Sequence, residues 1–241
     1  MITERLCRLE SELEQSLKGR SGSALAFSGG LDSSIILVSS GLNLKPYTAG
    51  FDDSRDVAVA SETALLLGSK TSVLRLDRDY VRKIAEIIIK LDPQVTRKEI
   101  GYEIVLGSIL DRSEEDAVVT GQGADELFYG YHVFLDQVVP DNSKHLEKLY
   151  STTLPREMKM AEEFSKELVT PFLSDGVKTI AESLGGPGCI GGSRNKIPLR
   201  DLAKKIGIPE TVAERPKKAA QYGSGVQNEL RKIRLSIDDR G

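Results

Sequence analysis

The chain has 241 residues, of which 39% are hydrophobic and 29% are charged, so it can bury a core of its own without disulfides or a structural metal. Its formal net charge of −3 argues against a main partner with a phosphate backbone, and no apolar run approaches the roughly 18 residues of a membrane helix. Cys7 and Cys189 form no CxxC pair, which removes the usual ligands of zinc ribbons and iron–sulfur clusters. The charged N-terminus has no apolar stretch typical of a signal peptide, and we expect a cytoplasmic protein.

The first part of the chain predicts strands that alternate with helices. Four short apolar runs have the length of buried strands: residues 24–27, 45–51, 71–76 and 116–120. Helices are indicated where apolar residues recur every three or four positions: residues 2–18, 54–67, 79–91, 98–112 and the run from Ile35 to Gly41. Strands separated by helices predict a parallel sheet with right-handed crossovers, which is an α/β fold.

From about residue 130 the strand pattern fades and helices dominate. The expected helices are residues 144–150, 156–168, 174–184, 199–206 and 226–236. The glycine-rich residues 185–192 predict a flexible connector. We therefore expect three parts, which are an N-terminal helix over residues 1–22, an α/β domain over residues 23–140 and a helical extension over residues 141–241.

The sequence Ser28-Gly29-Gly30-Leu31-Asp32-Ser33-Ser34 follows the first predicted strand and opens a helix. A glycine turn at a helix N-terminus presents backbone N–H groups to an anion, and serine hydroxyls add further donors. No lysine follows the glycines, so the turn is not the Walker-type loop of terminal phosphoryl transfer. An ordinary strand-to-helix turn is the alternative. The residues expected to bind phosphates are Ser28, Gly29, Gly30, Ser33 and Ser34, and Asp32 is expected to bind Mg²⁺.

This seven-residue sequence resembles the signature of the PP-loop, or N-type, ATP pyrophosphatases. These enzymes cleave ATP to AMP and pyrophosphate while they adenylate a substrate. The resemblance implies that residues 23–140 form a parallel-sheet domain of the adenine nucleotide alpha hydrolase type, with ATP and Mg²⁺ as cofactors. The family includes asparagine, GMP and NAD synthetases and tRNA-modifying enzymes, so this motif alone names no substrate.

A second motif follows the fourth predicted strand. Residues 120–131, TGQGADELFYGY, resemble the second signature of the synthetase domain of asparagine synthetase and its β-lactam synthetase relatives. Asp125 and Asp32 both lie just past strand ends, which meet at one edge of a parallel sheet, so the two carboxylates can share Mg²⁺. The alternative for Asp125 is an acid favoured by a helix N-terminus. Gly121, and Phe51 at the end of the second strand, are expected to approach the nucleoside.

Three further segments extend the likeness: residues 166–173, 196–200 and 214–225. By this match Lys217 stabilises negative charge on the α-phosphate and the leaving pyrophosphate, and Lys196 contacts a phosphate. Glu167 lies in the first of these segments, where the family carries a glutamate near the active site. The alternative for the basic run around Lys217 is a solvated turn.

Gln122 stands where many relatives carry an acid or a tyrosine that acts at the acceptor side. An amide can orient a substrate but cannot accept a proton. The proton therefore goes to Glu126, to Glu167 or to the leaving AMP, among which we favour Glu167, or the acceptor itself differs. No glutaminase domain is expected, because the chain begins with Met1 and Ile2 and lacks an N-terminal cysteine. Nitrogen would then come from free ammonia, a separate glutaminase subunit or another amine.

The resemblance implies a ligase that activates a small-molecule carboxylate as an acyl-adenylate, releases pyrophosphate and forms an amide with ammonia or an amine. On the resemblance alone, aspartate is the expected substrate, residues 141–241 complete the active site, and the protein is a homodimer. One alternative is adenylation of a tRNA base or another metabolite, which the acidic charge and the missing CxxC disfavour. The other is a non-catalytic ATP-binding module that regulates a glutaminase partner. We expect no membrane association and no nucleic-acid partner.

Overall fold

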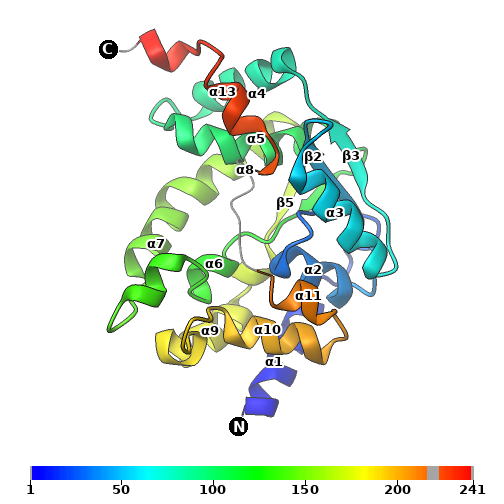
Figure 1. The fold of residues 1–241 in the computed structure, drawn as a ribbon, viewed down its shortest axis with the longest axis vertical. Coiled ribbons are helices and arrows are strands. Elements are labelled where there is room, and N and C mark those ends of the chain that lie inside the picture. The colour runs from blue at the N-terminus through cyan, green and yellow to red at the C-terminus, as the bar shows by residue number, and fades with distance from the viewer. Residues whose placement is uncertain (1, 216–222, 240–241) are drawn as a thin grey trace.

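The computed structural model describes residues 2–215 and 223–239, and its sheet confirms the predicted α/β fold (Figure 1). Five parallel strands lie in the order β3-β2-β1-β4-β5. Their bounds are Ala24–Ala26 for β1, Lys45–Gly50 for β2, Ser72–Arg75 for β3, Ala117–Val119 for β4 and Glu167–Val169 for β5. β1 is central, with Leu25 in register with Pro46 of β2 and Val119 of β4.

The strand order creates a point where the chain changes direction. The chain runs from β1 outwards through β2 to β3, and then returns to β4 on the other side of β1. In open parallel sheets, ligands bind in the crevice at such a switch point, beyond the carboxyl ends of the strands. The two turns singled out in the sequence follow β1 and β4, so the topology makes them neighbours.

Helices cover both faces of the sheet (Figure 1). Their bounds are α1 Ile2–Ser16, α2 Leu31–Ser39, α3 Arg55–Leu66, α4 Arg78–Leu91, α5 Arg97–Arg112, α6 Ala124–Leu127, α7 Ser143–Lys148, α8 Leu154–Glu163, α9 Asp175–Cys189, α10 Ile197–Lys205, α11 Glu210–Ala213 and α13 Val226–Leu230. Shorter turns of 3₁₀ or π helix are η1 His132–Asp136, η2 Leu149–Thr153, η3 Pro171–Leu173 and η4 Ser236–Asp239. In the described part of the chain, every helix is too short or too polar to cross a membrane.

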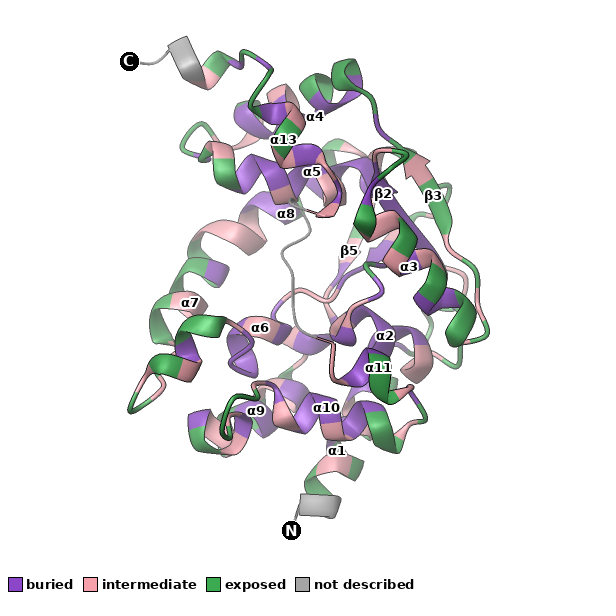
Figure 2. Ribbon diagram, viewed as in Figure 1, coloured by how far each residue is buried: buried purple, intermediate pink, exposed green. Residues whose placement is uncertain are grey.

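Side chains of the central strands alternate between two hydrophobic cores, as the period of two in a strand requires. Leu25 and Val119 face a core formed with α1, α2, α3, α9, α10 and α11. Ala24 and Val118 face the opposite core, formed with α4, α5, α8 and α13. Figure 2 shows that helices of both layers contain buried residues. Burial on both faces explains why these strands appear in the sequence as short, continuous apolar runs.

The sequence pattern does not predict β5, and the helix expected over residues 156–168 ends at Glu163. Ser165 has a left-handed backbone with φ of 56° after α8, and residues 167–169 then pair with β4. A strand of three residues, of which only Val169 is buried, is too short for a period of two to show. The expected helical extension therefore also contributes an edge strand to the sheet.

The flexible connector expected over residues 185–192 is wrong for its first part, because α9 continues to Cys189. The helix is interrupted at Gly185, where φ is 58° and ψ is −173°. Cys189 is fully buried and Gly186 packs against Pro140, so tertiary packing overrides the high glycine content. The helix expected over residues 226–236 ends early, at Leu230.

The substitution Leu13→Ala tests whether α1 is an integral part of the first core. Leu13 is fully buried, and its truncation should lower the free energy of unfolding by about 2–5 kcal/mol, because it removes apolar contacts and leaves a cavity. Urea denaturation followed by circular dichroism measures the change. Leu65→Ala on α3 is the matched control, since Leu65 is 65% exposed and its loss should change stability little. Equal effects of the two substitutions would show that α1 does not pack as described.

Candidate active site

The first glycine turn packs tightly against α3. Gly29 has φ of 68°, and a Cβ at this position would lie 2.9 Å from the Cα of Ala60. Glycine is therefore required both for the left-handed backbone and for the close approach to α3. The turn brings the N-terminus of α2 to the carboxyl end of β1, where the N–H groups of its first turn can receive an anion.

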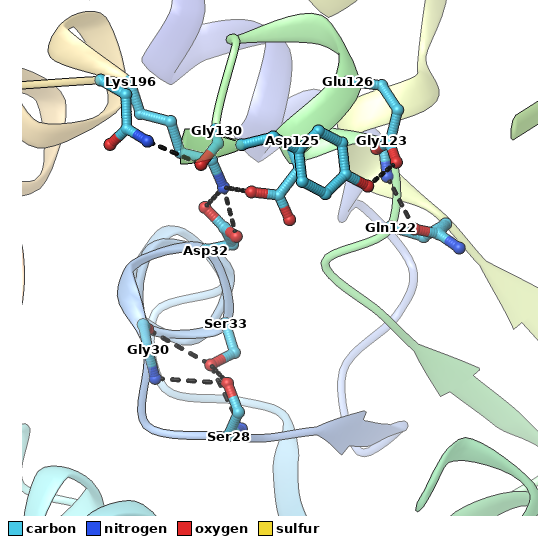
Figure 3. Close-up of polar contacts among 12 residues, drawn as sticks. Ser28, Gly30, Asp32, Ser33, Gln122, Gly123, Asp125, Glu126, Gly130 and Lys196 are labelled. Carbon is cyan, nitrogen blue, oxygen red and sulfur yellow. Dashed lines mark hydrogen bonds and ion pairs between the residues drawn. The ribbon is translucent and has the colours of Figure 1, made fainter. Parts of the chain in front are cut away.

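Hydroxyl groups line this turn, as Figure 3 shows. Ser28 Oγ accepts a hydrogen bond from Gly30 N and lies 3.3 Å from Ser33 Oγ, which contacts Gly30 O at 3.3 Å. These hydrogen bonds are long and therefore weak. Ser34 is fully buried, and its Oγ has no hydrogen-bond partner among residues 2–215 and 223–239. Phosphate oxygens are acceptors that would satisfy the weakly bonded groups of this turn.

The second glycine turn lies directly beside the first. A Cβ on Gly121 would lie 3.2 Å from the Cβ of Asp32, so the two turns are in contact. Gly123 has φ of 89° and caps α6, whose first turn carries Asp125 and Glu126. Figure 3 shows Asp32 and Asp125 directed towards the same point. The structure thus brings the two predicted aspartates together, although they are far apart in the sequence.

Lys196 joins these two aspartates. Its Nζ lies 2.7 Å from both carboxylate oxygens of Asp32 and 2.8 Å from Oδ1 of Asp125 (Figure 3). Lys196 is only 4% exposed. Burial disfavours the charged ammonium, but the carboxylates of Asp125 and Asp32 outweigh that effect and raise the pKa of Lys196 above its ordinary value. The lysine is therefore a permanent cation at the junction of the two turns.

The backbone around this lysine is shaped for the contact. Lys196 itself has φ of 52°, and the side chain of the preceding residue, Asn195, donates a hydrogen bond of 2.6 Å to Gly130 O. A Cβ on Gly130 would lie 2.0 Å from Asp125 Oδ1 and 2.2 Å from the Cε of Lys196. Only glycine at position 130 leaves room for the aspartate and the lysine to meet.

The donor set at this junction fits Mg²⁺ that arrives with a nucleotide. No group of three or more His, Cys, Asp or Glu residues that could hold a metal ion occurs in the ranges 2–215 and 223–239. Mg²⁺ is commonly bound by one or two carboxylates, and phosphate oxygens and water complete its six ligands. Asp32 and Asp125 supply such a pair, and the ammonium of Lys196 lies between them as the local positive charge. The two carboxylates fit a metal shared with a polyphosphate better than a metal held by protein alone.

Gln122 faces a buried glutamate that sequence reasoning missed. Its Nε2 donates a hydrogen bond of 2.6 Å to Glu157 Oε1 on α8, and its Oε1 accepts from the backbone N–H of Gly123. Glu157 is 5% exposed. Burial, with the negative charge of Glu103 nearby, raises the pKa of Glu157 well above its ordinary value. Glu157, next to the second glycine turn, therefore holds its proton more strongly than an exposed glutamate does.

Glu157 belongs to a buried charged cluster between α5 and α8. Arg156 is 2% exposed, and it donates hydrogen bonds of 2.9 Å to Glu103 and 2.8 Å to Asp92. Burial outweighs the attraction of Arg156 and raises the pKa of Glu103 to about 7. Acids outnumber the guanidinium of Arg156 among these residues, and the raised pKa values of Glu103 and Glu157 limit the negative charge that is buried behind Gln122.

A cavity of about 480 Å³ lies at the carboxyl end of β2, where the nucleoside is expected. Residues from two distant parts of the chain line it: Phe51, Asp53, Ser54, Arg55, Gly223, Gly225 and Asn228. The backbone N–H of Phe51 donates to the carbonyl of Ser224 at 3.2 Å, which ties the two segments together. The structure thus places Phe51 beside a cavity at the same sheet edge as the glycine turns.

Two predicted site residues do not join this cluster. Glu167 is the first residue of β5 and lies at the amino ends of the strands, whereas the glycine turns follow the carboxyl ends. Its half-exposed carboxylate forms an ion pair with Arg20. Parallel strands place their amino ends away from the switch point, so the motif match at residues 166–173 does not bring Glu167 to Gln122. Lys217 lies outside the residues that the structure describes.

Comparisons with known proteins agree with the two motifs. The family model described as asparagine synthase matches residues 8–146. A Methanocaldococcus jannaschii protein, named as a candidate glutamine-hydrolysing asparagine synthetase, is 30% identical over 93% of this chain and 50% of that protein. The glutamine-hydrolysing asparagine synthetase of Mus musculus is 27% identical over 86% of this chain and 40% of that protein. The chain thus spans about half the length, or less, of these curated relatives.

Among solved structures, the NH₃-dependent NAD synthetase of Campylobacter jejuni covers 90% of this chain and 98% of its own, at 15% identity and a TM-score of 0.38.

The raised pKa of Glu157 predicts a stability that depends on pH. Between the ordinary value of 4.5 and its raised pKa, the folded protein holds a proton that the unfolded chain has released, so this contribution to stability is lost as the pH rises. Glu157→Gln keeps an oxygen for Gln122 but removes the titration. The difference in unfolding free energy between the variant and the wild type should therefore grow in favour of the variant from pH 5 to pH 8.

Urea denaturation at both pH values measures this difference. Glu163→Gln, on an exposed position of the same helix, is the control and should give a difference that does not change with pH. A pH-independent effect of Glu157→Gln would contradict the raised pKa of the buried Glu157.

Proposed function

The chain belongs to the asparagine synthase family, and we propose that it is an ATP- and Mg²⁺-dependent ligase that forms an amide through an acyl-adenylate. A substrate carboxylate oxygen attacks the α-phosphorus of ATP, and the bond from that phosphorus to the pyrophosphate breaks. Ammonia or an amine then attacks the activated carbonyl carbon and displaces AMP. Aspartate is the substrate that family membership favours.

One observation carries the proposal, which is the convergence of Asp32, Asp125 and Lys196 beside the first glycine turn. Two carboxylates and one buried cation at a helix N-terminus suit a charged polyphosphate that brings a divalent metal with it. Mg²⁺, when bound there, would neutralise charge on the phosphates as pyrophosphate leaves. Asp32 and Asp125 are the residues that would hold it.

Different residues at the switch point bind different parts of the nucleotide. Backbone N–H groups around Gly30, with the hydroxyls of Ser28 and Ser33, bind the outer phosphates. The cavity beside Phe51 receives the nucleoside. Lys196 contacts a phosphate as a fixed cation aimed at developing negative charge, which is a strong means of lowering a barrier. The family likeness assigns a second such cation to Lys217.

At the acceptor side, Glu157 takes the place that the sequence alone assigned to Glu167. Glu157 is the carboxyl group that Gln122 contacts, whereas Glu167 lies at the amino ends of the strands. A raised pKa makes the ionised form of Glu157 a stronger base than an exposed carboxylate, so that form is suited to take up the proton that the attacking amine loses. Gln122 orients this carboxyl group through its amide. The nitrogen is supplied as free ammonia, by a separate glutaminase subunit, or as another amine.

The proposal predicts which nucleotide product is formed. Incubation with ATP, Mg²⁺, ammonium and pooled amino acids should yield AMP and pyrophosphate in a substrate-dependent manner, measured by chromatography of the nucleotides. Asp125→Asn should reduce AMP formation on the order of a hundredfold, because it removes one charge from the metal and phosphate site. Asp175→Asn is the control, since Asp175 is exposed and its carboxylate forms an ion pair with Lys178 on its own helix. Formation of ADP, or an active Asp125→Asn variant, would overturn the proposed function.

A further inference from the structure

Arg215 reaches the first glycine turn from the far end of the chain. Its Nη1 donates a hydrogen bond of 2.7 Å to the carbonyl oxygen of Gly29 and one of 2.8 Å to Thr63 Oγ1. Thr63 lies on α3, is fully buried, and itself donates to the Gly29 carbonyl at 3.3 Å. Two donors from separate elements thus hold one carbonyl group of the turn.

The contact with the Gly29 carbonyl also determines the direction of the next N–H group, because the peptide bond is planar. The C=O of Gly29 and the N–H of Gly30 belong to one trans peptide unit and point in opposite directions. With the carbonyl held by Arg215 and Thr63, the N–H of Gly30 faces Ser28 Oγ on the hydroxyl-lined side. Glycine rotates easily, so without an anchor this peptide could turn its carbonyl oxygen towards the hydroxyl-lined side. A carbonyl oxygen there would repel an anion.

The segment that carries Arg215 is itself held in place by Arg200. The guanidinium of Arg200 is buried and donates to the carbonyl of Ala213 at 2.7 Å and to that of Asn195 at 2.8 Å. Asn195 in turn contacts Gly130 beside the second glycine turn. A continuous set of hydrogen bonds therefore connects the first turn, through the two arginines, to the segment that positions Lys196.

We propose that Arg215 is a positioning residue, which holds the Gly29 carbonyl away from the nucleotide so that the N–H of Gly30 points towards the outer phosphates. This inference rests on the proposed function in one respect, which is that the turn binds a nucleoside triphosphate. The guanidinium acts through the Gly29–Gly30 peptide and not by contact with the phosphates. Thr63 supports the same peptide from α3.

The test is a comparison of ATP and AMP binding by the purified chain in the presence of Mg²⁺, measured by isothermal titration calorimetry. Arg215→Gln should weaken ATP binding about tenfold, as expected for loss of a charge-assisted hydrogen bond, and leave AMP binding within about twofold. Thr63→Val removes the second donor at nearly constant volume and should weaken ATP binding about threefold. Because both act through one peptide, the double variant should bind ATP no worse than Arg215→Gln alone.

Two further variants serve as a control and as a replacement for Arg215→Gln. Arg194→Gln is the matched control, since Arg194 pairs with the neighbouring Glu214 but not with the turn, and its ATP affinity should equal that of the wild type. If Arg215→Gln does not fold, Arg215→Lys replaces it, because one ammonium can still donate to the Gly29 carbonyl and should retain most of the ATP affinity.

Each outcome decides the inference. Two results would overturn the positioning role and show that Arg215 contacts the phosphates directly. One is a Thr63→Val variant with wild-type ATP affinity, and the other is a double variant in which the two losses of ATP affinity multiply. Equal weakening of ATP and AMP binding would also overturn it. A wild-type chain that binds no ATP would overturn the proposed function, and the inference would fall with it, whereas normal ATP binding by every variant would overturn the inference alone.

Discussion

The contact of the Lys196 ammonium with the carboxylates of Asp32 and Asp125 is the constraint on which the site depends. Two carboxylates so close would repel each other, and a lysine that is 4% exposed would lose its hydration without compensation. Together they offset both costs, and the contact joins the turn after β1, the turn after β4 and the N-terminus of α10. In the function that we propose, a nucleotide with its metal would meet an arrangement of charges that the fold has already assembled.

The parallel sheet explains why residues so distant in the sequence can meet. β1 and β4 are neighbours, and each ends in a turn where glycine is required, at Gly29 by the approach of α3 and at Gly123 by the side chain of Leu173. The C-terminal half closes the site from the other direction. It contributes Lys196, the edge strand β5, and Arg215 behind the first turn. The two halves are therefore one catalytic unit in our account, although only the first contains the glycine turns.

Those parts of the molecule that depend on local sequence could be predicted. Apolar runs predicted the four strands β1 to β4. The glycine turns and the rule for parallel sheets predicted that Asp32 and Asp125 lie close together. Strand β5 could not be predicted, because three residues carry no periodic signal. The direct contact of Lys196 with the aspartates was also not expected, since the family likeness assigned Lys196 to a phosphate.

Glu157 shows a second limit of sequence reasoning. It lies between the motifs, in a predicted helix, and its importance comes from burial and from Gln122, which are tertiary properties. One signal was present in the sequence, because Arg156 and Glu157 precede Met160 and Ala161 on a helix whose apolar face is narrow. Charged residues on a buried helix face are almost always paired, so the neighbouring Arg156 and Glu157 were candidates for buried, partnered groups. Glu167 lies in a segment that resembles the family motif, but it lies at the amino end of β5, away from the glycine turns.

The most direct test of the central claim is a crystal structure with a non-hydrolysable ATP analogue, bridged by methylene between its α- and β-phosphates, and with Mn²⁺ located by anomalous scattering. The account predicts one Mn²⁺ within coordination distance of carboxylate oxygens of both Asp32 and Asp125, with the outer phosphates on the turn at Gly29 and Gly30. A metal held away from these aspartates, or phosphates bound at another edge of the sheet, would contradict it.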